Sequence, residues 1–261
     1  MLVQIDGTPF DWFNDGNIYT LHLAVDDATT EALAGWFCPT ERQFGYCAMM
    51  RILLEKHGIP MALYSDKHSV FRNNGAAENL PTQFAMMMED LGIECIFASS
   101  PEAKGRVERY NGTVQNRLPN DIIRFQVPDY ENLNYWLNDF YLPYINRKFA
   151  FVPLDPHDAF VPLDEYDISD VFTLRFDRII NNDMFSLNSR YYCVLDDYGT
   201  PLHIINGTKI NLRIDVFTEE IRVLRYGKKH NVKMLFDRKR KKNQLIDGQK
   251  DLFDFLHHFR E

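Results

Sequence analysis

The chain has 261 residues, of which 45% are apolar and 25% are charged, enough for one large domain or two smaller ones. No apolar run is long enough to cross a bilayer, and the N-terminus lacks the basic and apolar blocks of a signal peptide. The formal net charge of -8 is unevenly distributed, since residues 222–250 contain 11 Lys and Arg but only 2 Asp and Glu. These features exclude membrane-spanning and secreted proteins, and four scattered cysteines fit a cytoplasmic, reducing setting.

Residues 1–148 are predicted to form an α/β domain. Apolar and polar residues alternate in 17–25, as in a strand, whereas Phe44, Cys47 and Leu53 recur at helical spacing. The predicted elements follow in the order strand 2–13, strand 17–25, strand 32–38, helix 41–57, strand 61–65, helix 82–91, strand 93–98, helix 101–118 and helix 130–146. The first three strands, joined by short turns, suggest an antiparallel meander within a mixed sheet.

A second domain is predicted after an extended linker. Residues 149–170 contain three prolines and no clear periodicity, which is typical of a connector. Residues 171–236 form short strand-like runs separated by Asn, Asp and Gly turns, which indicates a small all-β barrel. Residues 237–261 form a basic tail that begins with the run RKRKK at 238–242, and we expect it to contact phosphate.

The helix predicted at 101–118 carries a carboxylate beside its apolar stripe. Val107, Tyr110 and Val114 recur at helical spacing and indicate a packed face. Glu108 lies about a third of a turn away from that stripe, at the border between core and solvent. The simplest interpretation is a solvated Glu108 paired with Arg106 or Arg109, and the rest of the chain supports another.

Three carboxylates are candidates for a shared site. Asp6 ends the first predicted strand, Asp66 ends the fourth, and Glu108 lies in the helix after the fifth. Acids that converge at neighbouring strand ends repel one another unless a cation joins them, and Mg²⁺ prefers oxygen ligands. Asp11 is a rival to Asp6, whereas the Asp26-Asp27 pair is read as turn chemistry.

Three sequence segments carry a resemblance to a known superfamily: QIDGTPFDWF, YSDKHSVF and SPEAKGRVERYNGTVQNRL. Together they resemble the catalytic core of the DDE transposase and retroviral-integrase superfamily, and more closely the ISNCY-type transposases of bacterial insertion sequences. The resemblance covers roughly residues 2–150. It implies an RNase H-like fold, a five-stranded mixed sheet with helices, followed by a small β-barrel.

The resemblance also implies a function: DNA cleavage and strand transfer by a polynucleotidyl transferase. Asp6, Asp66 and Glu108 would be the catalytic acids and the ligands of two Mg²⁺ ions, for which Mn²⁺ can substitute. The residues expected to contact DNA are Lys67, His68, Lys104, Arg106, Arg109, Asn111, Arg238, Lys239, Arg240, Lys241 and Lys242. The expected partners are transposon ends, target DNA and further copies of the chain assembled on DNA, which would place the protein at the nucleoid.

Two other functions stay open. Such transposases normally carry helix-turn-helix domains before the core, whereas here Met1 stands five residues before Asp6. We therefore expect either a truncated reading frame or an excised core. The first alternative is a non-catalytic remnant that binds DNA or transposase subunits, and the second is a structure-specific nuclease of the same fold.

Overall fold

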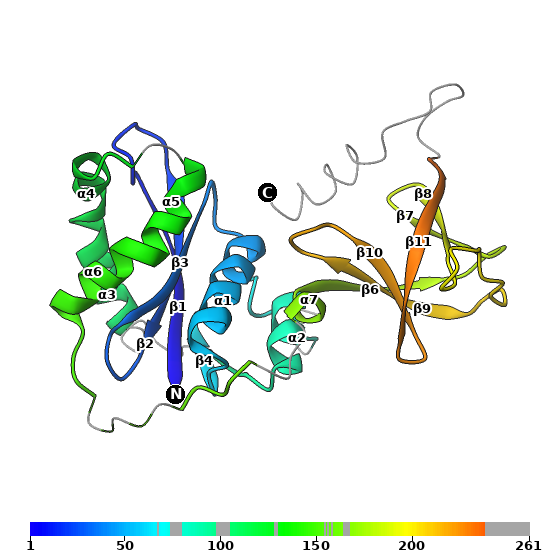
Figure 1. Ribbon diagram of the computed structural model, residues 1–261, viewed down its shortest axis with the longest axis horizontal. Helices are drawn as coiled ribbons and strands as arrows, with labels where there is room; N and C mark the ends of the chain where they lie inside the picture. The colour runs from blue at the N-terminus through cyan, green and yellow to red at the C-terminus, as the bar shows by residue number, and fades with distance from the viewer. Residues whose placement is uncertain are drawn as a thin grey trace. The chain divides into compact units, whose positions relative to one another are not determined.

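The computed structural model divides the chain into two compact units, Met1–Val171 and a second unit that begins at Phe172 (Figure 1). The structure describes residues 1–66, 68–73, 80–97, 105–127, 130–153, 155, 157, 159–163 and 168–237, without the side chains of 130, 131 and 169.

The first unit is built on a mixed five-stranded sheet. Its strands are β1 Leu2–Phe10, β2 Tyr19–Asp26, β3 Ala32–Cys38, β4 Ala62–Ser65 and β5 Glu94–Phe97. They lie in the order β3-β2-β1-β4-β5, with β1, β2 and β3 antiparallel and β1, β4 and β5 parallel. The predicted meander, the mixed sheet and the RNase H-like α/β fold are therefore confirmed.

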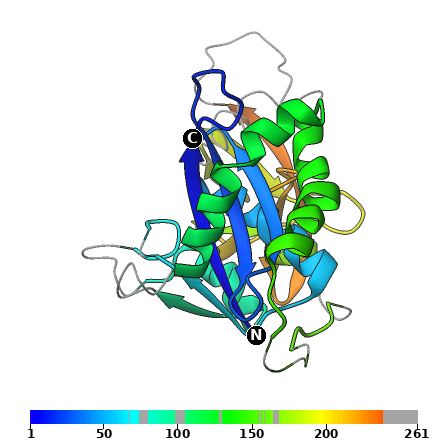
Figure 2. The same cartoon turned by 90° about the vertical axis from the view of Figure 1, so that its left-hand side faces the viewer.

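Helices cover both faces of this sheet, with α3 to α6 on one face and α1 and α2 on the other (Figures 1 and 2). They are α1 Gln43–His57, α2 Gln83–Asp90, α3 Gly105–Gln115, α4 Leu118–Arg124, α5 Tyr130–Trp136, the π-helix η3 Leu137–Tyr141, α6 Leu142–Phe149 and α7 Ile168–Val171. The alternation of β2 explains the core, because Leu21, Leu23 and Val25 pack with Val107 and Val114 of α3. None of the helices in the described part of the chain could span a membrane.

The helical arm of α5, η3 and α6 extends three residues beyond its predicted end at residue 146, and the supposedly extended linker contains the short helix α7. Three buried asparagines of the arm bind the backbone of the edge strand β3. They accept backbone N–H hydrogen bonds in three pairs: Asn146 from Ala32 (3.0 Å), Asn138 from Gly35 (2.9 Å) and Asn134 from Phe37 (2.7 Å). The side chains therefore take the place of a sixth strand and close this edge to other pairing.

The second unit is an antiparallel six-stranded sheet, as the sequence predicts for an all-β domain. Its strands are β6 Thr173–Ile179, β7 Met184–Leu187, β8 Arg190–Val194, β9 Lys209–Asp215, β10 Ile221–Arg225 and β11 Lys228–Asp237. They lie in the order β6-β9-β10-β11-β8-β7. The outer strands β6 and β7 are consecutive in the chain, and the turn that joins them is closed by a bridge between Asn181 and Met184, so the sheet curls into half a barrel.

Candidate active site

Two of the three predicted acids lie on neighbouring strands. Gln4 of β1 is paired in parallel with Tyr64 of β4. Asp6 and Asp66 each lie two residues further along, so the same register brings them side by side on one face of the sheet. Neighbouring strands are about 4.8 Å apart, and Asp66 is the first residue after β4. The parallel β1–β4 ladder ends at Gln4 and Tyr64, so both carboxylates lie just beyond it. Asp6 lies in the middle of β1, which continues to Phe10 paired with β2, so the prediction that Asp6 ends the first strand was wrong.

Helix α3 is attached to β1 at two points beside these acids. The backbone N–H of Val107 donates to Gln4 Oε1 over 3.1 Å, and Asn111 Nδ2 donates to Asp6 Oδ2 over 2.8 Å. Asn111 is only 5% exposed, and its Oδ1 atom is buried without a hydrogen-bond partner among the described residues. A buried carbonyl oxygen left in this way is costly unless a further group binds it.

Glu108 lies on the outer surface of α3. It precedes Asn111 by three residues, which places it about 60° around the helix from that side chain. Its side chain is exposed. In the part of the chain that the structure describes, no three His, Cys, Asp or Glu residues are gathered closely enough to hold a metal ion. The structure thus brings Asp6 and Asp66 together and leaves Glu108 nearby on the helix surface.

The predicted DNA contacts around α3 have partners within the protein. Arg106 Nε lies 3.1 Å from Asp27 Oδ1, and Arg109 Nε donates to the Gly105 carbonyl oxygen over 2.7 Å. Both arginines are near the surface, and neither forms the simple pair with Glu108 that the sequence offered as an alternative. The predicted contacts that lie outside the described residues are Lys67, Lys104, Arg238, Lys239, Arg240, Lys241 and Lys242.

A carboxylate that the sequence analysis missed, Glu41, lies next to the acid pair. It follows β3, and its Oε1 accepts a hydrogen bond of 2.7 Å from Tyr46 Oη. Burial first, and then the charges of Glu41, Asp6 and Asp66, raise the pKa of Tyr46 well above its usual value, so the phenol remains a donor. Gly7, which follows Asp6 directly, was the available signal, because a glycine inside a strand permits close approach by another group.

The donor set of this region fits a hard divalent cation. Asp6 and Asp66 supply carboxylate oxygens, and Asn111 supplies an unsatisfied carbonyl oxygen. Such oxygen ligands are those that Mg²⁺ prefers, and it retains several waters where the protein supplies few ligands. Neutralising adjacent carboxylates also removes their mutual repulsion.

Sequence comparison identifies relatives of the chain. It is 40% identical over 161 residues to y4bF of Sinorhizobium fredii (strain NBRC 101917 / NGR234), a protein named as a transposase, covering 60% of this chain and 35% of y4bF. It is 35% identical over 154 residues to the transposase for insertion sequence IS1202 of Streptococcus pneumoniae, covering 57% of this chain and 33% of that protein. The chain is related to insertion-sequence transposases. It spans about a third of the length of these relatives, and no protein-family model matches it.

Two solved structures are also similar to this chain. One is the HTLV-2 integrase catalytic core domain in complex with magnesium in its trimeric form, with 20% identity and a TM-score of 0.39, covering 52% of this chain and 82% of that chain. The other is a simian T-cell lymphotropic virus intasome in complex with PP2A regulatory subunit B56 gamma, with 15% identity and a TM-score of 0.41, covering 88% of this chain and 77% of that chain.

The second unit carries a row of arginines that the sequence did not indicate. Arg213 of β9 is paired with Arg175 of β6 on one side and with Arg222 of β10 on the other. Cross-strand partners point to the same face, so the three half-buried guanidinium groups lie side by side. Arg213 Nε donates to Asn211 Oδ1 over 2.7 Å, and Arg222 Nη2 lies 2.6 Å from Glu220 Oε2. Adjacent like charges destabilise a sheet, and an anion would relieve that cost.

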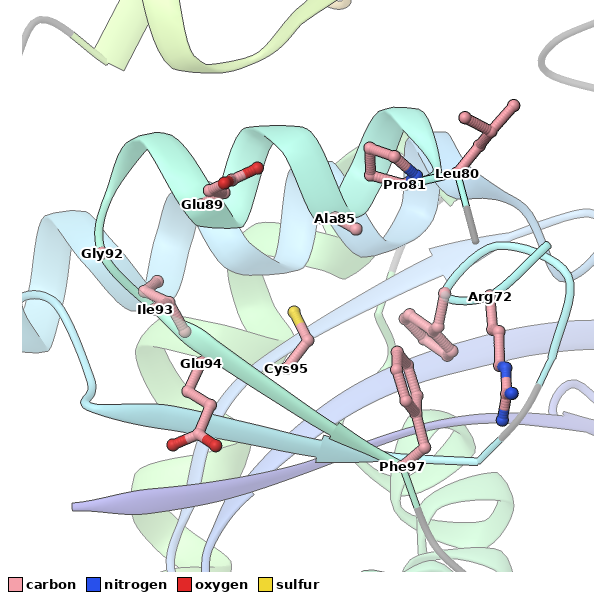
Figure 3. Close-up of a pocket in the computed structure, with 11 residues that line it drawn as sticks. Arg72, Leu80, Pro81, Ala85, Glu89, Gly92, Ile93, Glu94, Cys95 and Phe97 are labelled. Carbon is pink, nitrogen blue, oxygen red and sulfur yellow. The ribbon is translucent and has the colours of Figure 1, made fainter. Parts of the chain in front are cut away.

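A groove of about 890 Å³ lies between α2 and β5 of the first unit (Figure 3). Phe71, Ile93, Cys95 and Phe97 make its lining largely apolar. Figure 3 shows Arg72 close to Phe97, and Glu94 at the other end of β5. The groove contains none of the predicted acids, and it is chemically unlike the acid site.

Proposed function

We propose that this chain carries the catalytic core of a DNA transposase, which cleaves DNA strands and joins the new ends to target DNA. The observation that carries the proposal is the position of Asp6 and Asp66 on neighbouring strands just beyond the parallel β1–β4 ladder, with the unsatisfied Asn111 Oδ1 beside Asp6. Relatedness to insertion-sequence transposases supports it.

Asp6, Asp66 and Glu108 are the residues that would hold Mg²⁺, and we propose two ions, with Mn²⁺ as a substitute. When bound, such ions stabilise the charge that develops during phosphoryl transfer. Asn111 keeps the Asp6 carboxylate in one orientation through its 2.8 Å hydrogen bond. Glu108 lies one helical turn before Asn111, so it can supply the third carboxylate from the surface of α3.

The proposed reaction is an in-line displacement at phosphorus that occurs twice. In the first step water attacks a phosphodiester at the transposon end, a new P–O bond forms, and the bond to the 3′-oxygen breaks. The departing 3′-oxygen takes up a proton and becomes a hydroxyl group. In the second step this hydroxyl attacks a target phosphodiester and loses its proton, while the target's own 3′-oxygen leaves. The protein's contribution is to position these groups and stabilise charge.

DNA contact is proposed for both units. In the first unit, His68 follows Asp66 by two residues, and Arg106 and Arg109 lie on the helix that carries Glu108. In the second unit, the arginine row of Arg175, Arg213 and Arg222 presents positive charge over a face rather than at a point. This arrangement suits the regularly spaced phosphates of a DNA strand. Self-association on DNA is proposed as well.

The alternative is a non-catalytic protein that binds DNA or transposase subunits. The exposed position of Glu108 favours it, as does the lack of a gathered three-carboxylate group among the described residues. Under this alternative the arginine row would still bind DNA, and substitution of the acids would leave DNA binding unchanged.

Strand joining on a pre-branched DNA substrate with Mn²⁺ or Mg²⁺ separates the two functions, because this substrate requires no recognition of a transposon end. We expect Glu108→Gln and Asp66→Asn each to lower the rate by at least about 100-fold, since metal stabilisation of the transition state is worth several kcal/mol. Glu55→Gln is the matched control, because Glu55 is an exposed residue of α1 paired with Arg51. A folded, DNA-binding chain without metal-dependent product would support the non-catalytic alternative.

A further inference from the structure

Glu41 and Tyr46 occupy the space beside β1 that Gly7 leaves open. A Cβ atom added to Gly7 would lie 2.8 Å from both Glu41 Cδ and Tyr46 Oη. The hydrogen bond between Tyr46 Oη and Glu41 Oε1 fixes this pair over the backbone of the residue that follows Asp6. Glu41 is only partly exposed, at 25% of its side-chain surface. The carboxylate is therefore held in contact with the strand that carries the first acid.

The same carboxylate reaches the turn that carries the second acid. Glu41 Oε1 lies 3.8 Å from His68 Nδ1, a packing contact that is longer than a hydrogen bond. The backbone N–H of His68 donates to Asp66 Oδ1 over 2.9 Å. The Val70 N–H approaches the same imidazole nitrogen at 3.5 Å, so the ring lies between Glu41 and its own turn. Glu41, His68 and Asp66 thus form a continuous set of contacts.

A buried histidine anchors the backbone next to Glu41. The N–H of Arg42 donates to His22 Nε2 over 3.2 Å, which leaves Nδ1–H to donate to the Trp36 carbonyl oxygen over 3.2 Å. Burial, more than the charges of Arg42 and His68, lowers the pKa of His22 to about 4, which keeps this arrangement neutral near pH 7. Glycine is required at Gly45, where a Cβ would lie 2.3 Å from the His22 ring. Glu41 therefore projects from a support that does not depend on the Asp66 turn.

We propose that Glu41 is a positioning residue for the acid pair: its side chain packs between Gly7 and His68 and so holds the Asp66–His68 turn against β1. This inference rests on the proposed function, since it gives a purpose to a carboxylate kept beside two others. Groups that orient metal ligands without touching the metal alter affinity or activity about 10-fold to 100-fold. If Glu41 served only to accept the hydrogen bond from Tyr46, its substitution would alter neither metal affinity nor activity.

The test compares Glu41→Ala with the unsubstituted chain. Alanine removes the side chain that packs between Gly7 and His68. We expect the affinity for Mn²⁺, measured by titration calorimetry, to fall about tenfold. We also expect the NMR resonance of the His68 backbone amide to move in the metal-free chain, because the turn that donates to Asp66 is no longer held. Glu55→Ala, on the same helix as Tyr46, should change neither.

Tyr46→Phe provides a second variant, because it keeps the Glu41 side chain and removes the hydroxyl that holds it. It should shift the His68 amide in the same way, and melting curves of both variants verify that they are folded. An unshifted amide and unchanged Mn²⁺ affinity in Glu41→Ala would overturn the inference. If the unsubstituted chain binds Mn²⁺ no better than Asp66→Asn, the proposed function fails instead. The amide shift in the metal-free chain would still decide the role of Glu41.

Discussion

The second unit displays charge as a row of arginines across β6, β9 and β10, whereas the first unit places two carboxylates just beyond the end of the parallel β1–β4 ladder. Antiparallel strands in register place like residues along a line about 4.8 Å apart. Parallel strands bring their carboxyl ends to one edge, where side chains converge. The first geometry suits an extended polyanion, and the second suits a single small cation.

The surroundings of the two charged regions differ as well. Around the acids, Gly7 and Gly45 have no room for a Cβ atom, and His22 is fully buried. The arginine row lies on the outward face of its sheet, and Arg213 is partly exposed. The acid site is therefore expected to depend on exact packing and on pH, while the arginine row should depend mainly on charge.

The largest expected effect is a loss of stability of the first unit in acid. His22 has a pKa lowered from 6.5 to about 4, so between these values the unfolded chain binds a proton that the folded chain does not. The free energy of unfolding then falls as pH falls, by about 3 kcal/mol across the window. Arginines stay charged throughout, so the second unit lacks this contribution from its row. Urea unfolding at pH 7 and pH 4.5, followed by tryptophan fluorescence, measures it.

Tryptophan fluorescence reports the first unit alone, because Trp12, Trp36 and Trp136 are the three tryptophans of the chain. His22→Gln should be less stable than the unsubstituted chain at pH 7 and lose less stability on acidification. The control is His157→Gln, since the His157 side chain is 89% exposed. Equal acid sensitivity of the unsubstituted chain and His22→Gln would contradict a role for His22.

A smaller effect is expected from Gly7→Ala. The added Cβ would lie 2.8 Å from Tyr46 Oη and Glu41 Cδ, so these groups must move. Overpacking of this kind costs about 1–3 kcal/mol. Gly112→Ala on α3 is the matched control, because nothing lies within 4 Å of its Cβ position and alanine favours helix by about 0.5–1 kcal/mol. If both variants unfold at the same urea concentration, the surroundings of Gly7 are not packed tightly enough for an added methyl group to matter.

The smallest effect is expected from Arg213→Gln, the central member of the arginine row. Loss of one phosphate contact should reduce the slope of log affinity against log salt concentration by about 1, with the same reduction for unrelated DNA sequences. Fluorescence anisotropy with labelled duplex DNA at several salt concentrations measures the slope. Arg51→Gln, in the first unit, removes one positive charge from an exposed ion pair and serves as the control. An unchanged slope for Arg213→Gln would exclude the row from the DNA interface.

Most strands and helix stripes were predictable from local pattern. Alternation located β2, and the spacing of Val107, Tyr110 and Val114 located the packed face of α3. The end of β4 just before Asp66 followed from the same patterns, whereas the predicted end of the first strand at Asp6 was wrong, because β1 continues to Phe10. Local pattern could not reveal the three asparagines that bind β3, since each bond joins residues separated by 97 to 114 positions in the chain.

The sequence by itself determined most strands and helices of the first unit, its mixed α/β composition and the position of Asp66 at the end of β4. It did so because propensity and hydrophobic period act over a few residues. Only the tertiary structure decided that Glu41 lies over Gly7, that Asn111 binds Asp6 and that three arginines form a row. These contacts join residues separated by tens of positions, and strand register and helix docking select them. Their partners share no local pattern in the chain, so packing alone brought them together.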